Sequence, residues 1–143
     1  MGSVSLNEIC VTPLKRISVT GGDVLHAMKK SDTGYVGFGE AYFSLVEFGK
    51  KKAWKRHLQM TLNLVVPIGE VQFVFIDSVG LIREVRIGEG HYARLTIPPG
   101  IWFGFQGVSK KTALLLNIAD IEHSPDEVEL KELDEVKYDW EVI

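Results

Sequence analysis

The chain has 143 residues and a formal net charge of −3, which fits one domain with its own core and argues against nucleic acid as a partner. Cys10 is the single cysteine, so an intrachain disulfide is excluded. Because no stretch reads as a signal peptide or a membrane-spanning run, we expect a soluble, cytoplasmic protein without a membrane partner.

Short segments rich in β-branched and aromatic residues, separated by Gly, Pro, Asn and Asp, predict strands along most of the chain. In chain order we expect strands at about 4–14, 22–28, 37–48, 57–67, 70–77, 82–87, 92–97, 102–107 and 112–118. Near the C-terminus, Ser124 as N-cap, Pro125 and an acid at Glu127 predict one short helical turn. This spacing is typical of an all-β sandwich or barrel, here a single domain over 1–143.

Polar residues alternate along the expected strand 57–67. Side chains of a strand alternate between its faces, so one face would carry a polar row made of His57, Gln59, Thr61 and Asn63. Such a row is either the wall of a pocket or an ordinary solvent-facing surface. The segment by itself leaves both interpretations open.

Basic residues crowd the segment just before this row, at Lys50, Lys51, Lys52, Lys55 and Arg56. The cluster is either a solvated turn or a receptor for a phosphate-bearing ligand. Asn117 interrupts an apolar run, and a buried amide needs hydrogen-bond partners. It is expected either to face a cavity or to bond a neighbouring strand.

Two segments narrow the all-β class: Pro67-Ile68-Gly69-Glu70-Val71, and the run from Leu95 to Phe105 that contains Ile97-Pro98-Pro99-Gly100 and then Gly104-Phe105. They resemble the dTDP-4-dehydrorhamnose 3,5-epimerase family of the cupin superfamily. The prolines end a strand and Gly100 allows a tight turn. The resemblance, from about 37 to 140, implies a jelly-roll fold, a homodimer and a nucleotide-activated 4-keto-deoxysugar substrate from polysaccharide or cell-surface glycan synthesis.

By this resemblance His57 is the catalytic base, and a neutral imidazole can accept a proton at cellular pH. The alternative is a histidine whose bonds are satisfied at a strand start. The resemblance also implies that Gln59, Asn63 and Asn117 orient the sugar or polarise its ketone, and that Lys55 and Arg56 lie near the diphosphate. Trp102 and Tyr42 would offer flat faces to the sugar or base, although such aromatics often belong to a core.

The chain departs from the family at several positions. The family's tyrosine falls near Leu116, its lysine near Leu62 or Asn63, and its arginine at Trp54. Its acid that orients the histidine lies in a C-terminal extension, whereas this sequence stops at Ile143. We therefore expect a shortened, divergent member that inverts one stereocentre or moves a ketone. The alternative is a noncatalytic sugar-binding or nucleotide-sugar-binding cupin.

Many cupins bind a transition metal through histidines and an acid. The corresponding residues here are His57, Gln59, Asn63 and Phe103. One imidazole with two amides is a poor site for a divalent transition metal. We therefore expect no metal and no organic cofactor.

Overall fold

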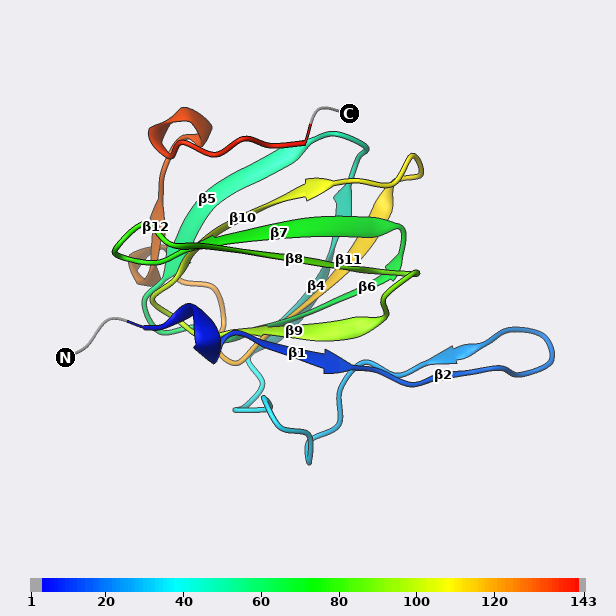
Figure 1. Cartoon of the computed structure of the whole chain (residues 1–143). Coiled ribbons are helices and arrows are strands. Elements are labelled where there is room, and N and C mark those ends of the chain that lie inside the picture. Colours follow the sequence, from blue (N-terminus) through cyan, green and yellow to red (C-terminus); the bar gives the residue numbers. More distant parts are fainter. Residues whose placement is uncertain (1–3, 142–143) are drawn as a thin grey trace.

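The computed structural model describes residues 4–141 and consists of two five-stranded antiparallel sheets packed face to face (Figure 1). We call the sheet with strand order β1-β9-β6-β11-β4 the first sheet, and the sheet with order β12-β5-β10-β7-β8 the second sheet. The first sheet comprises β1 (Cys10–Pro13), β4 (Glu40–Val46), β6 (Leu62–Ile68), β9 (Ala93–Ile97) and β11 (Ala113–Ala119). The second comprises β5 (Lys51–His57), β7 (Glu70–Ile76), β8 (Ile82–Gly88), β10 (Trp102–Gly107) and β12 (Val128–Leu130).

A small hairpin and three single turns complete the described chain. The strands β2 (Arg16–Ile17) and β3 (Val24–Leu25) pair only with each other and project from the body (Figure 1). The 3-10 turns are η1 (Leu6–Glu8), η2 (Pro125–Glu127) and η3 (Leu133–Glu135). None of the helical segments between residues 4 and 141 is long and apolar enough to cross a membrane.

The core lies between the two sheets, where alternate side chains of each strand point inward. Leu62, Leu64 and Val66 face it from β6, and Phe73 and Phe75 from β7. The expected jelly-roll architecture of the cupins and the short C-terminal turn are confirmed, with proline at the first position of η2. The prediction of one long strand at 4–14 is wrong, because η1 and the four-residue β1 occupy that region.

The expected single strand at 57–67 is also wrong. His57 ends β5, and β6 begins only at Leu62. In between, the backbone N–H groups bind Glu127 instead of a neighbouring strand: Leu58 donates to its carbonyl at 2.7 Å, and Gln59 and Met60 donate to its carboxylate at 3.2 and 3.1 Å. The alternation of the polar row is therefore interrupted.

The basic segment is a strand rather than a turn, since Lys51, Lys52, Lys55 and Arg56 belong to β5. The Pro98-Pro99-Gly100 turn behaves as expected: β9 ends at Ile97, and Gly100 takes a φ of 93° that favours glycine. The N–H of Gly100 donates to the carbonyl of His57 at 2.8 Å. The turn thereby fixes the end of β5, where the expected base lies.

Candidate active site

The two faces of β5 carry different residues. Phe103 and Phe105 of β10 point into the core, and their cross-strand partners are Lys55 and Lys52. Residues paired directly across an antiparallel ladder share a face, so both lysines point inward. The register shifts between these pairs, and this irregularity brings Lys52 to the same side as Lys55. Strict alternation would have placed the two lysines on opposite faces.

His57 and Glu127 form a buried pair at the inner end of β5. Their side chains are 8% and 4% exposed, and Nδ1 of His57 lies 2.5 Å from Oε1 of Glu127. Strand β12 begins at the residue after Glu127, and Val128 pairs with His57. The start of β12 thus brings together two residues that are 70 positions apart in the chain.

Hydrogen bonding decides the tautomer of His57. Burial pushes the pKa of Glu127 upward, but bonds from His57 and from the N–H groups of Met60 and Gln59 hold it below its ordinary value of 4.5. The ionised carboxylate accepts, so Nδ1 carries the hydrogen. Nε2 is then a free lone pair, and among the described residues it has no hydrogen-bond partner. Burial also holds the pKa of His57 below 6.5, against the opposing pull of Glu127, which keeps the ring neutral.

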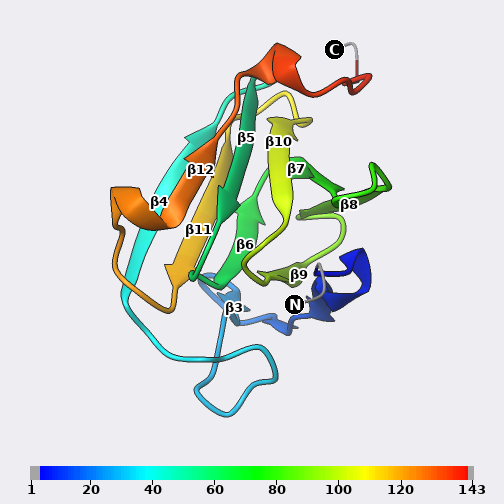
Figure 2. The same ribbon diagram turned by 90° about the vertical axis from the view of Figure 1, so that its left-hand side faces the viewer.

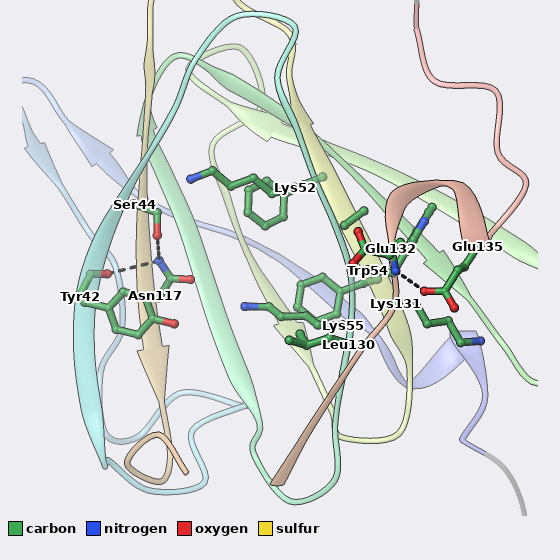
Figure 3. Close-up of a pocket in the computed structure, with 13 residues that line it drawn as sticks. Tyr42, Ser44, Lys52, Trp54, Lys55, Asn117, Leu130, Lys131, Glu132 and Glu135 are labelled. Carbon is green, nitrogen blue, oxygen red and sulfur yellow. Dashed lines mark hydrogen bonds between the residues drawn. The ribbon is translucent and has the colours of Figure 1, made fainter. Parts of the chain in front are cut away.

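A cavity of about 400 Å³ opens between the two sheets and is lined by residues of both (Figure 3). Lys52, Lys55 and Phe103 line it from the second sheet. The ring of His57 lies 6.4 Å from that of Phe103, which is one of the lining residues, whereas His57 itself lies behind this lining. Burial lowers the pKa of Lys55, whose Nζ lies 5.6 Å over the Phe103 ring.

The opposite wall belongs to the first sheet. Tyr42, Ser44 and Asn117 line it, and the amide of Asn117 donates to Ser44 Oγ at 3.2 Å and to the Tyr42 carbonyl at 3.3 Å. Figure 3 shows the amines of Lys52 and Lys55 extending from β5 toward this wall. Lys52 crosses to the first sheet, where its Nζ donates to the carbonyl of Leu45 at 3.0 Å. Burial raises the pKa of Tyr42, so its phenol stays protonated.

No protein-family model and no curated protein sequence matches the chain. Among solved structures, a dTDP sugar isomerase from Desulfovibrio desulfuricans G20 is 34% identical, with a TM-score of 0.85 over 89% of this chain and 85% of that chain. This chain belongs to the family of dTDP-sugar isomerases and dTDP-4-dehydrorhamnose 3,5-epimerases.

Two solved structures of lower sequence identity share the fold. A sugar 3,4-ketoisomerase from Thermoanaerobacterium thermosaccharolyticum, solved with TDP, is 16% identical with a TM-score of 0.74, covering 91% of this chain and 92% of that one. A dTDP-4-dehydrorhamnose 3,5-epimerase from Bacillus anthracis is 14% identical with a TM-score of 0.81, covering 99% and 89%.

Family membership gives the His57–Glu127 pair its significance. The sequence had suggested that this family member lacks an acid to orient the histidine, and that expectation is wrong. Glu127 was expected to close a capping box in η2, yet Ser124 makes no side-chain cap bond and the carboxylate turns to His57 instead. In the sequence, the only notable feature of Glu127 is its position three residues after a possible N-cap. That feature does not indicate a contact with His57.

Three residues expected in this family's site lie on other faces. Arg56 points outward, pairs with Glu129 and lies 5.0 Å over the Trp102 ring, and with Trp102 it lines a separate outer groove of about 660 Å³. Asn63 lies on the outer face of the first sheet, where it binds the Gly34 carbonyl at 3.0 Å and Thr96 Oγ1 at 2.6 Å.

Gln59 was also expected in the site. Its side chain is exposed in the bend after β5, and only its backbone N–H takes part, by donating to the carboxylate of Glu127. Of the expected site residues, Lys55, Asn117 and Tyr42 therefore line one cavity, and His57 lies two residues after Lys55 on the same face of β5. Between residues 4 and 141, no group of three or more His, Cys, Asp or Glu side chains could hold a metal ion.

Proposed function

We propose that this protein is a nucleotide-sugar epimerase or isomerase that removes a proton beside the ketone of a nucleotide-activated 4-keto-deoxysugar. The observation that carries the proposal is the buried Nε2 of His57, which has no partner among the described residues while Glu127 holds Nδ1 at the inner end of β5. A base needs a lone pair aimed by a second group, and this pair supplies both. The activities named for the family's solved members support the same class of reaction.

His57 takes the proton in the first step. Nε2 forms the new N–H bond, the C–H bond next to the ketone breaks, and its electron pair leaves negative charge on the ketone oxygen as an enolate. Glu127 stabilises the imidazolium that results, because an ionised carboxylate lies 2.5 Å from Nδ1. The proton is stored on His57, and the step needs no electron acceptor.

Lys55 supplies the cation for the enolate oxygen. The family's lysine position falls at Leu62 or Asn63, but Leu62 is core and Asn63 lies on the outer face. Lys55 shares the inward face of β5 with His57 and lines the cavity. A charge developing in a partly buried site is stabilised strongly by such an amine.

Tyr42 supplies the acid from the opposite wall. A proton delivered by its phenol to the face away from His57 inverts that carbon. Protonation of the former carbonyl carbon and its oxygen, with loss of the neighbouring hydroxyl proton, moves the ketone instead. With one base on one wall, we propose that one carbon reacts per turnover. We propose that Lys52, which also lines the cavity, contacts the diphosphate.

Proton exchange tests this function directly. dTDP-4-keto-6-deoxyglucose is incubated with the protein in deuterated water and followed by NMR and mass spectrometry. We expect deuterium at a single carbon next to the ketone, with either an inverted centre or a shifted ketone in the product. Calorimetric binding of the sugar without any deuterium uptake would instead identify a noncatalytic nucleotide-sugar-binding protein.

A further inference from the structure

A second cavity, which we call the outer cavity, lies on the side of the first sheet that faces away from the core. Its volume is about 270 Å³, and it is bounded by the end of β1, by the residues between β1 and β2, and by the segment 26–33 after β3. Figure 2 shows that the chain after β3 forms a loop before it leads into β4. The outer cavity shares no lining residue with the cavity between the sheets. The two cavities are therefore separate sites.

Arg94 of β9 is a fully buried cation in the lining of the outer cavity. Its neighbours Ala93 and Leu95 point into the core. Because side chains alternate along a strand, Arg94 points to the outer side of the first sheet. A buried guanidinium is costly unless its N–H groups are paired. The partners of Arg94 therefore decide what this site can bind.

The chain satisfies only part of the Arg94 guanidinium. Nη1 donates to the carbonyl of Ala27 at 3.0 Å and to the carboxylate of Asp32 at 3.2 Å, and Nη2 donates to the carbonyl of Thr33 at 2.9 Å. Nε is buried and has no hydrogen-bond partner within the described range 4–141. The Nε–H group and one Nη–H group form an edge of the planar guanidinium that binds carboxylates or phosphates through two parallel bonds. That edge keeps an unused donor.

Charge around the outer cavity favours a doubly negative ligand. Its lining contains the cations Lys15, Lys29 and Arg94 and the single carboxylate of Asp32, which leaves a formal charge of +2. The carboxylate is already engaged, because the backbone N–H of Lys29 donates to it at 2.7 Å and lowers its pKa, and Arg94 pairs with it as well. A phosphate monoester carries about 1.5 to 2 negative charges near pH 7, whereas a carboxylate carries one. The lining therefore matches a phosphate group better than a carboxylate.

The size of the outer cavity limits what the phosphate can carry. Sites for drug-sized ligands have volumes of about 300–1,000 Å³. The cavity between the sheets lies within that range at about 400 Å³, whereas the outer cavity lies just below it at about 270 Å³. It has room for a phosphate or a phosphate with a small attached group, and it is too small for a nucleotide-activated sugar.

We propose that the outer cavity binds a phosphate group, either as free phosphate or as the phosphomonoester of a small metabolite. One phosphate oxygen accepts a hydrogen bond from Nε of Arg94, and the exposed Lys15 and Lys29 contact the other oxygens. The bound phosphate joins the segment 26–33 to the β1 edge of the first sheet. This inference does not depend on the proposed activity.

The Nε–H resonance of Arg94 reports directly on this site. The whole chain, labelled with ¹⁵N, is titrated with inorganic phosphate at constant ionic strength and about pH 7.5, where phosphate is mostly doubly charged. We expect this resonance to shift and to saturate at millimolar phosphate, and acetate to shift it far less. Tighter binding of glycerol phosphate than of inorganic phosphate would identify a small metabolite as the ligand, and the reverse order would identify free phosphate.

Lysine variants test the lining without disturbing the buried arginine. Lys15→Gln and Lys29→Gln should each weaken phosphate binding about 10-fold in calorimetric titrations, because each removes a charge-assisted contact. Lys30→Gln is the matched control, since Lys30 is also exposed but does not line the outer cavity. Lys52→Gln, which changes the cavity between the sheets, should leave the Arg94 shift unchanged.

Three results would overturn the proposal. The first is an Arg94 Nε–H resonance that phosphate does not move. The second is an equal shift with sodium chloride of the same ionic strength, which would show general screening. The third is an equal loss of affinity in Lys30→Gln, which would show attraction to any nearby lysine instead of a built site.

Discussion

The two faces of β5 place neighbouring basic residues in opposite environments. On the outer face, Arg56 has a carboxylate partner in Glu129 and an indole surface in Trp102. On the inner face, Lys55 and His57 lie between the sheets, and the buried Nε2 of His57 has no partner among the described residues. Satisfied groups stabilise a fold, whereas groups held buried and unsatisfied are available for a substrate. Substitutions on the inner face of β5 should therefore lower the reaction rate, whereas substitutions on its outer face should lower stability.

The largest effect is expected for His57→Asn. Removing the base should lower the rate of deuterium incorporation by about 10²–10⁴-fold, while asparagine retains a polar group for Glu127. The rate is measured by NMR in deuterated water, and circular dichroism verifies the fold. Exchange at the wild-type rate would show that another group removes the proton.

Glu127→Gln should lower the same rate by about 10–100-fold, because a charge-assisted hydrogen bond of roughly 1.5–3 kcal/mol no longer supports the imidazolium. The effect should fall on kcat rather than KM, since the carboxylate contacts His57 and not the sugar. An equal loss in Glu129→Gln, the matched carboxylate on the outer face, would indicate a general effect on β12 instead.

Lys55→Met and Arg56→Met compare the two faces directly. Loss of the inner cation should slow exchange by about 10-fold or more, whereas Arg56→Met should leave exchange unchanged and cost about 0.5–1 kcal/mol of stability. Burial lowers the pKa of Lys55 below its ordinary value of 10.5. As the pH rises toward 10.5, Lys55 should therefore lose its charge and the exchange rate should fall, and Lys55→Met should not show this decrease. A slower Arg56→Met enzyme would place the outer groove in substrate binding.

Acid stability gives a smaller effect of known sign. The folded-state pKa of His57 lies below its ordinary value of 6.5, so below pH 6.5 the unfolded chain binds a proton that the folded chain does not. Stability should therefore fall as the pH drops from 6.5 toward the folded-state pKa. The depressed pKa of Glu127 adds a further loss below pH 4.5. Urea denaturation across pH should show a weaker dependence near pH 6 in His57→Asn than in His91→Asn, an exposed control.

Asn63→Ala tests the last contrast, between the cavity and the outer face of the first sheet. It should cost about 1–3 kcal/mol, because Thr96 Oγ1 and the Gly34 carbonyl lose a buried partner. Exchange with substrate should be unaffected once the protein is folded. If Asn63→Ala slowed deuterium exchange while its free energy of unfolding equalled that of the wild type, Asn63 would belong to the active site after all.

Local chemistry was enough to predict much of this protein. Turn residues such as Pro98, Pro99 and Gly100 restrict their own backbone, so strand ends and the all-β class follow from the sequence. The family motifs are also local, because each lies within a short stretch of chain, and they were enough to single out His57 as the candidate base. The strand β5 was missed because its lysines resemble a solvated turn, and only pairing with β10 and β12 makes them a strand.

Tertiary structure alone decided which of these residues meet. Glu127 reaches His57 across 70 positions because β12 begins beside the end of β5. The same carboxylate binds the backbone after His57, interrupts the alternation and leaves Asn63 on the outer face. The register shift opposite β10 turns Lys52 inward with Lys55. Each outcome depends on a partner distant in sequence, and alternation within one strand holds no information about such partners.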